Sequence, residues 1–165
     1  MSIADLFHAI QETEWATGIR ESALTYPIIL TTHLTTIALF GGMILLSDLR
    51  LLGLTLRKWP VADVVSPLRL WKRFGLVVMV SAGFLLAASK ADSYYPNPYF
   101  RLKMALLAMV AVHALVFRRS VYDKAAEFDR TGIPRHAKIA AALSLLLWSS
   151  IVCCGRWIAY YEPPK

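Results

Sequence analysis

Charged residues are scarce in this chain. Only 18% of the 165 residues are charged, and 57% are hydrophobic. A soluble domain of this size would expose more charge. Between Glu21 and Asp48 there is no charged residue at all. Such a stretch is a candidate membrane span, because about 20 apolar residues cross the ~30 Å hydrocarbon core of a bilayer.

The motifs of common enzymes are also missing. The sequence has no glycine-rich phosphate loop, no His-Glu-x-x-His pair and no Gly-x-Ser-x-Gly turn, so hydrolytic and nucleotide-driven activities have no residues to carry them. No segment resembles a nucleic-acid-binding motif. Ion transport would need a carboxylate within the membrane, whereas Asp48 lies at the end of its apolar stretch. We therefore expect neither a stand-alone enzyme nor a nucleic-acid-binding protein, and a redox or electron-transfer role stays open.

Four charge-poor segments predict four membrane-spanning helices. We expect them at about residues 22–47, 70–90, 99–121 and 137–158. The third has only about 14 residues free of charge, or roughly 21 Å of helix. It spans a bilayer if Arg101 and Lys103 extend their charged ends to the headgroups. The sequence thus predicts an all-α fold, a polytopic membrane four-helix bundle in which residues 1–165 form one domain.

Basic residues predict the orientation of the bundle. Six lysines and arginines fall between Asp48 and Arg73, and another six between Arg118 and Lys138. An excess of this kind marks loops on the cytoplasmic side, and it explains the net charge of +7. Both termini are then expected to face outward, which for a protein of the bacterial inner membrane is the periplasm.

The first segment predicts a short amphipathic helix on the membrane surface. It is acidic and lacks the basic start and cleavage site of a secretory signal. Ser2 is a suitable N-cap, and His8 is expected to be a surface residue. The apolar face contains Ile3, Leu6, Phe7 and Ile10.

His33 is an ionisable residue inside the first apolar stretch, between the pairs Thr31-Thr32 and Thr35-Thr36. Such a residue is costly in a membrane and indicates a functional site. His113 occupies the third predicted span, and the two histidines would lie roughly 12 and 18 Å below the outer ends of their helices. Two imidazoles facing each other across a bundle can bind a haem iron from both sides. The sequence therefore favours a haem b-binding electron-transfer module.

Other residues would complete such a site. An iron-bound histidine usually donates its second ring N–H to a carbonyl or hydroxyl group, and Thr36 is the candidate acceptor. Haem propionates need cationic partners, for which we single out Arg101 and Arg156. Lys90 and Lys103 stand on the same predicted side. Glycines would leave room for a macrocycle or allow close helix packing, namely Gly41, Gly42, Gly75 and Gly83.

Two further interpretations use the same residues. The histidines can bond neighbouring helices and only hold the bundle together. The protein would then be an accessory subunit of a larger membrane complex, without a cofactor. Alternatively, Met109 precedes His113 by one helical turn, and both could bind copper together with His33. The paired cysteines Cys153 and Cys154 are expected to be small buried hydrophobic residues.

Several stretches resemble a bacterial family of small four-span inner-membrane proteins, a domain of unknown function. These stretches are residues 18–22, Tyr26-Pro27 with His33, and residues 48–53, 97–103 and 155–160. The resemblance covers nearly the whole chain and implies the fold and the location, but no activity. None of these stretches includes His113, so the resemblance does not support a paired-histidine site. The architecture is also similar, at the level of fold alone, to copper-resistance membrane proteins and cytochrome b-type bundles.

Overall fold

The computed structural model describes residues 2–117, 121 and 123–162. In this part of the chain the secondary structure is helical, and no strand occurs. The four longest helices are α3 (Thr25–Leu52), α5 (Leu68–Ser89), α7 (Pro98–Phe117) and α9 (Arg135–Trp157). Together with α4 (Val61–Val65), which leads into α5, they are long and apolar enough to cross a membrane. The predicted all-α fold with four candidate spans is confirmed.

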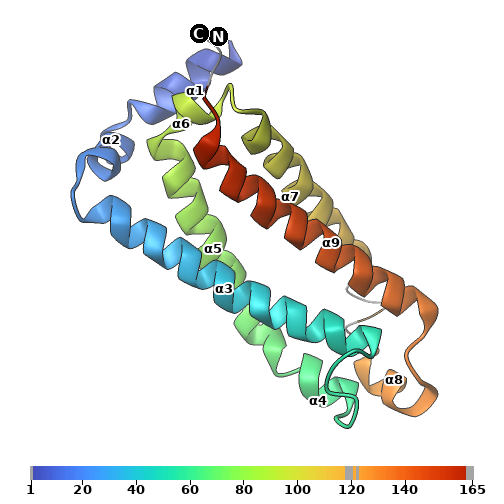
Figure 1. The fold of residues 1–165 in the computed structure, drawn as a ribbon. Helices are drawn as coiled ribbons and strands as arrows, with labels where there is room; N and C mark the ends of the chain where they lie inside the picture. The colour runs from blue at the N-terminus through green and yellow to red at the C-terminus, as the bar shows by residue number, and fades with distance from the viewer. Residues whose placement is uncertain (1, 118–120, 122, 163–165) are drawn as a thin grey trace.

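Short helices cover both ends of the bundle (Figure 1). α1 (Ile3–Gln11), α2 (Glu14–Glu21) and α6 (Ala91–Tyr94) lie at one end, which we call the cap end. α4 and α8 (Ala125–Thr131) lie at the other, which we call the loop end. A short 3-10 helix, η2 (Ile158–Tyr160), follows α9 at the cap end. An even number of long helices thus returns the chain to the end where it began.

The predicted N-terminal helix is confirmed as α1. Its first turn is held by Ser2, whose hydroxyl accepts from the Asp5 amide, while the Asp5 carboxylate accepts from the Ser2 amide. Such a reciprocal cap satisfies two amide groups that the helix itself leaves open. The Phe7 ring packs against Tyr95, with 5.1 Å between the ring centroids, so the helix rests on the turn after α6.

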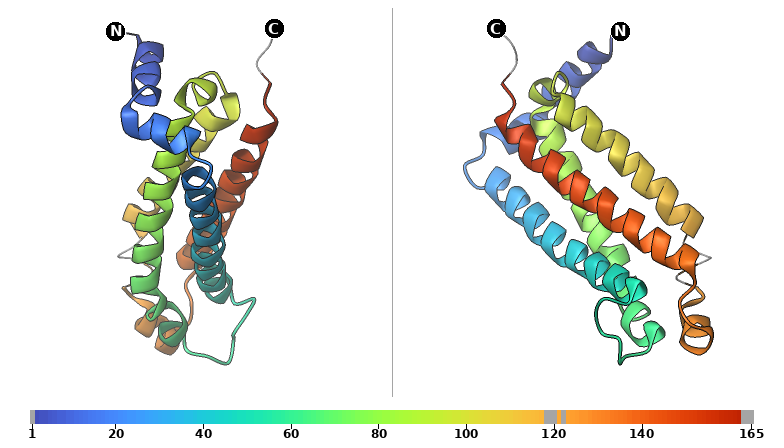
Figure 2. Two further views of the ribbon diagram at one scale, coloured as in Figure 1. Left: turned by 90° about the vertical axis from the view of Figure 1, so that its left-hand side faces the viewer. Right: turned by 45° about the vertical axis from the view of Figure 1, so that its right-hand side comes forward.

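The long helices do not pack equally tightly. α3 contacts both α5 and α9, and α9 contacts α7. Figure 2 shows α7 beside α9, on the outside of the assembly. None of the residues of α7 is buried. The bundle is therefore built around the three helices α3, α5 and α9, with α7 added to one side.

Apolar residues fill the middle of the bundle. Phe40 and Ile44 of α3 meet Met79 of α5, and the Phe40 ring packs edge-on against Trp148 at 5.2 Å. A second cluster lies at the loop end, where Leu51, Val61, Val65, Val121, Phe128 and four alanines are buried together. This second cluster joins α4 and α8 to the long helices.

α3 extends further than the apolar stretch predicted. It continues through Asp48 and Arg50, both buried, and ends at Gly53 in a left-handed conformation (φ 76°). The Arg50 guanidinium donates two hydrogen bonds to the Trp59 carbonyl, at 3.0 and 2.6 Å. Charged residues can continue a span when such partners satisfy them. At the far end of the third predicted span, residues 118–120 lie outside the described part of the chain.

Candidate functional site

His33 is held by the backbone of the neighbouring helix. Its Nδ1 lies 2.9 Å from the carbonyl oxygen of Met79 in α5. Because a carbonyl can only accept, Nδ1 carries the hydrogen, and Nε2 of the neutral ring keeps a lone pair. This is the arrangement in which a histidine ligates a metal, since the bond from the other nitrogen fixes the tautomer and the orientation of the ring.

Gly83 makes this arrangement possible. A Cβ atom at this position would lie 2.8 Å from Cε1 of His33, closer than any real contact. Gly75 likewise faces Phe40, whose Cβ would lie 3.4 Å from an added Cβ. Both glycines therefore let α3 and α5 approach closely, which is one of the two roles predicted for them. By contrast, a Cβ added at Gly41 or Gly42 would meet no neighbouring atom within 4 Å.

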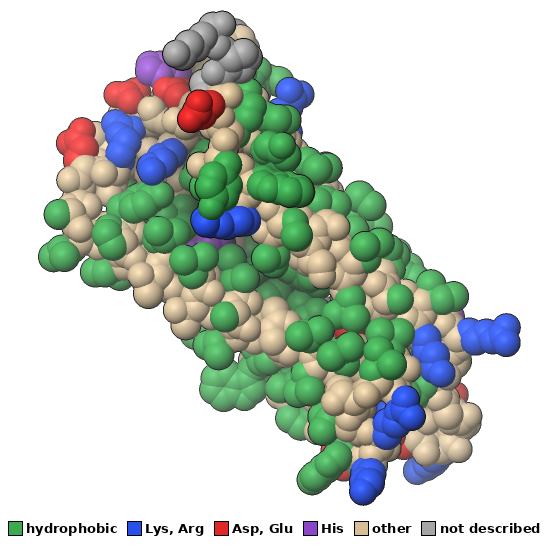
Figure 3. Space-filling model, in the orientation of Figure 1, with side chains coloured by type: hydrophobic (Ala, Val, Ile, Leu, Met, Phe, Trp, Pro, Cys, Tyr) green, Lys and Arg blue, Asp and Glu red, His purple; other side chains and the backbone are tan. Residues whose placement is uncertain are grey.

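Lys103 is the charged neighbour of this histidine. Its Nζ lies 3.5 Å from the place that a Cβ of Gly155 would take, so the side chain extends from α7 to α9. The ammonium group interacts electrostatically with His33 and with Cys154. Figure 3 shows basic and histidine side chains together in a hollow among hydrophobic ones, toward the cap end. We call His33 of α3, the Met79 carbonyl of α5 that it bonds and Lys103 of α7 the polar layer.

Acidic residues are almost absent from the long helices. The ranges 25–52, 68–89, 98–117 and 135–157 contain a single carboxylate, Asp48. It stands 15 residues after His33, or about 22 Å along the helix. Of the ion pairs between described residues, none involves Lys103. The polar layer around His33 therefore combines an imidazole and a cation without an acid.

Asn97 sets the position of α7. Its Oδ1 accepts from the amides of Tyr99 and Phe100 at 3.0 and 3.3 Å, which caps the first turn of the helix. Its Nδ2 donates to the carbonyl of Ile158 at 3.1 Å and thereby ties α7 to the end of α9. Asn97 is 2% exposed. Lys103 lies less than two turns further along α7, so this one side chain helps to direct it toward α9.

His113 has a different environment from His33. Its Nε2 lies 3.0 Å from the carbonyl of Ala140 in α9, and its ring packs on Phe117. His33 bonds the backbone of α5 and His113 bonds the backbone of α9, so the two histidines have no hydrogen-bond partner in common. Met109 and His113 instead line one apolar groove of about 430 Å³ between α7 and α9. His33, the third residue of the copper interpretation, does not line this groove.

The other predicted cofactor residues have local partners. The Thr36 hydroxyl donates to the carbonyl of Thr32 at 2.7 Å, so the Met79 carbonyl, rather than Thr36, is the acceptor for His33. The Arg156 guanidinium donates to the Tyr160 hydroxyl and lies 4.8 Å from the centre of its ring. Arg101 is exposed. Within the described residues, no three histidine, cysteine or acidic side chains gather as metal ligands.

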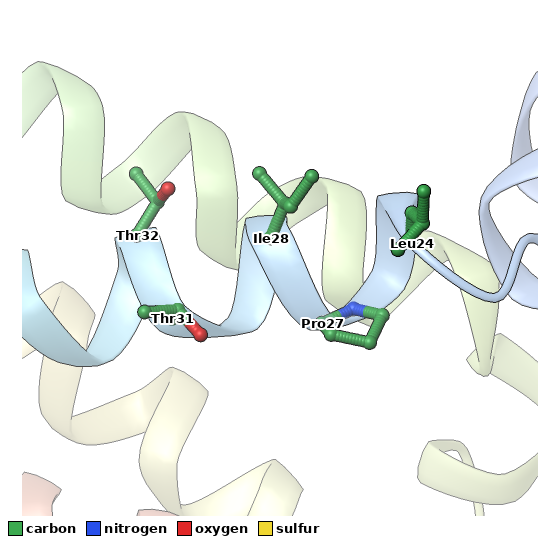
Figure 4. Close-up of a pocket in the computed structure, with 5 residues that line it drawn as sticks. All are labelled: Leu24, Pro27, Ile28, Thr31 and Thr32. Atoms are coloured by element: carbon green, nitrogen blue, oxygen red, sulfur yellow. The ribbon is translucent and has the colours of Figure 1, made fainter.

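A second groove lies on the outer face of α3. It has a volume of about 300 Å³ and is lined by Leu24, Pro27, Ile28, Thr31 and Thr32. Figure 4 shows these side chains along the first turns of the helix. The groove is open and mostly apolar, and His33 is not among its lining residues. The threonines before His33 thus face away from the polar layer.

A buried polar cluster near the loop end was not predicted from the sequence. Ser47 and Asp48 are at most 1% exposed, and Lys72 of α5 donates to the Ser47 hydroxyl at 3.1 Å. Asp48 also interacts electrostatically with Lys72. One signal was present in the sequence, because Phe40, Ile44 and Asp48 are spaced four residues apart and so share a helix face.

These features define a helical protein with four helices long and apolar enough to span a bilayer, which suggests a multi-pass membrane protein. The chain belongs to a family of unknown function, DUF6644, which matches residues 22–161. The matched range includes the polar layer and leaves out α1 and α2. A comparison with curated proteins gave no match, and a comparison with solved structures gave none either.

Proposed function

We propose that the protein is a haem b-binding electron-transfer module in which His33 would hold the haem. The observation that carries the proposal is the hydrogen bond from Nδ1 to the Met79 carbonyl. It leaves Nε2 as a lone-pair donor and increases the basicity of the ring. A cation, Lys103, stands near enough to act on the imidazole. In the proposal His33 would hold the metal, and Lys103 would receive an anionic side chain of the same group.

Haem b, when bound, supplies reversible one-electron chemistry, and the protein tunes it through the axial ligand and its surroundings. The Met79 carbonyl would orient His33, and the apolar layer of Phe40 and Ile44 would exclude water from the loop-end side. Space for a macrocycle would come from α7. Since none of its residues is buried, moving it outward costs less apolar burial than moving any other span.

An absorption spectrum of the protein purified in a mild detergent tests this proposal. We expect a Soret band that disappears in His33→Ala. His136→Ala is the matched control, since His136 is exposed at the start of α9, and its spectrum should equal that of the wild type. A colourless, iron-free preparation would end the haem proposal. His113→Ala then decides the second ligand, because a changed band identifies His113 and an unchanged band excludes it.

A second candidate is an accessory subunit of a larger membrane complex. The observation that favours it is α7, which is apolar and has no buried residue. An uncovered helix of this kind offers a surface for helices of a partner. Purification from the native membrane would then yield a partner protein in stoichiometric amount. Elemental analysis of this preparation would find neither haem iron nor copper. Bound copper that is lost in Met109→Leu would instead support the copper-binding alternative.

A further inference from the structure

We propose that Lys103 is the binding residue for a carboxylate group that enters the polar layer from the cap end. The inference rests on the proposed function, because it names the residue that receives the anionic part of the ligand at the same site. Two sources share this chemistry: a propionate of the cofactor, or a free hydrophobic carboxylate such as a fatty acid. The experiments below distinguish them.

The first argument is the direction of the Lys103 side chain. A lysine near the end of a span usually extends along the helix to the headgroups. Here the stem instead crosses to α9, where Gly155 leaves an open place for the ammonium group. The side chain is only partly exposed. The cation is therefore directed across the bundle to α9 and not along α7 to the headgroups.

The second argument is the lack of an internal counter-charge. A partly buried ammonium group needs an anion or several hydrogen-bond acceptors to offset its lost hydration. The four long helices contain one carboxylate, Asp48, about 22 Å away from His33 along α3. Of the described acids of the cap end, Asp92 bonds His8 and Gln11, Glu12 pairs with Arg20, and Asp5 bonds Ser2. Glu14, Glu21 and Glu162 are exposed, and no ion pair joins them to Lys103.

The third argument concerns the competing cations. Arg156 is exposed and bonded to Tyr160, and Lys90 lies 4.6 Å from the centre of the Tyr26 ring. Arg101 is exposed to the surroundings. Among the described basic residues of the cap-end half, Lys103 is thus the one whose side chain crosses from α7 to α9. An ammonium group with three donors and one charge suits a single carboxylate.

The decisive variant is Lys103→Gln, and Lys138→Gln is its matched control, because Lys138 is exposed at the start of α9. Binding of benzoate and laurate to the protein in a non-ionic detergent is measured by calorimetry, with benzamide as the uncharged comparison. We expect the wild type and Lys138→Gln to bind the carboxylates and not benzamide. Lys103→Gln should bind them about tenfold or more weakly, since one partner of a sheltered charge pair is removed.

Gly155→Val is a second variant that tests the site if Lys103→Gln does not fold. It keeps every charge but fills the place beside Nζ, so carboxylate binding should fall as in Lys103→Gln. Equal carboxylate binding by wild type, Lys103→Gln and Gly155→Val would overturn the inference.

Haem content separates this inference from the proposed function. If the wild type carries haem, Lys103→Gln should retain less of it under dialysis, which identifies a propionate as the carboxylate. A colourless wild type that binds laurate through Lys103 would refute the haem proposal and support the carboxylate site with a free acid as its ligand. A coloured wild type whose haem retention and carboxylate binding are the same in Lys103→Gln would refute the carboxylate site alone.

Discussion

At the scale of single residues, the position of the His33 ring depends on the missing side chain of Gly83. The ring occupies the space beside Gly83, and its Nδ1 reaches the Met79 carbonyl only because the two helices lie close together. The imidazole is therefore oriented by a backbone carbonyl. A substitution of Met79 changes the side chain and leaves this carbonyl in place. A substitution of Gly83 can test this orientation, because an added side chain would meet the His33 ring.

Gly83→Ala should push the His33 ring out of its position, because the new methyl group would lie 2.8 Å from Cε1. We expect a loss of roughly 1–3 kcal/mol in stability from overpacking, measured as a lower Tm in detergent. Gly42→Ala is the control, since its new methyl group would meet no neighbouring atom within 4 Å. It should raise stability slightly, by about 0.5–1 kcal/mol, through helix propensity. Equal Tm values for the two variants would contradict the packing described.

Asn97→Ala should loosen α7 at its first turn. It removes the cap for two amides and the bond to Ile158, at a cost of roughly 1–2 kcal/mol. Hydrogen exchange of the amides of residues 99 and 100 should become faster, while that of α3 stays constant. Asn97→Asp keeps the oxygen that caps the helix but sets a second carboxylate oxygen against the Ile158 carbonyl, so it should lower stability while the amides of residues 99 and 100 stay capped. Unchanged exchange in Asn97→Ala would contradict this role.

At the scale of helices, α1 is attached to the cap end by polar contacts. His8 Nδ1 lies 2.9 Å from the Asp92 carboxylate, which also accepts from Gln11 at 3.0 Å. The hydrogen bond to Asp92 raises the pKa of His8 above its ordinary value, and Glu12 and Asp5 on the same helix add to the effect. The ion pair therefore forms when His8 is protonated.

The attachment of α1 should weaken as the pH rises. A raised pKa means that the contribution of the pair is complete below the ordinary histidine pKa of about 6.5 and is lost as the pH passes the higher value in the folded protein. Amide exchange in α1 should accelerate over that range, and the acceleration should be absent in His8→Gln. The effect is expected to be small, because both side chains are solvent-accessible. Exchange that is independent of pH after correction for the intrinsic rate would refute it.

The helices also show what the sequence can and cannot predict. The four spans were predicted because charge-free stretches are a property of local sequence, and Ser2 was predicted as a cap from residue type alone. The continuation of α3 through Asp48 and Arg50 was missed, since their partners, Lys72 and the Trp59 carbonyl, come from later segments. For the same reason the acceptor for His33 was sought on its own helix at Thr36 and found on α5.

At the scale of the whole molecule, the topology follows from the even number of spans. α1, α6 and the end of α9 share the cap end, and α4 and α8 share the loop end (Figure 1). The excess of basic residues in the two loops predicts that the loop end faces the cytoplasm. A periplasm-active reporter enzyme fused after residue 162 should therefore be active in a bacterial host, and one fused within the segment 54–59 should be inactive. The reverse pattern would refute this orientation.

The apolar layer formed by Phe40, Ile44, Met79 and Trp148 separates the His33 layer from the Asp48–Lys72 cluster. Moving a bare charge through such a layer is costly, because hydrocarbon offers no groups to solvate it. The layer thus acts as an electrical insulator between the two halves of the bundle. If a redox group is held at His33, as proposed, the proton or ion that compensates its change of charge would then come from the cap end.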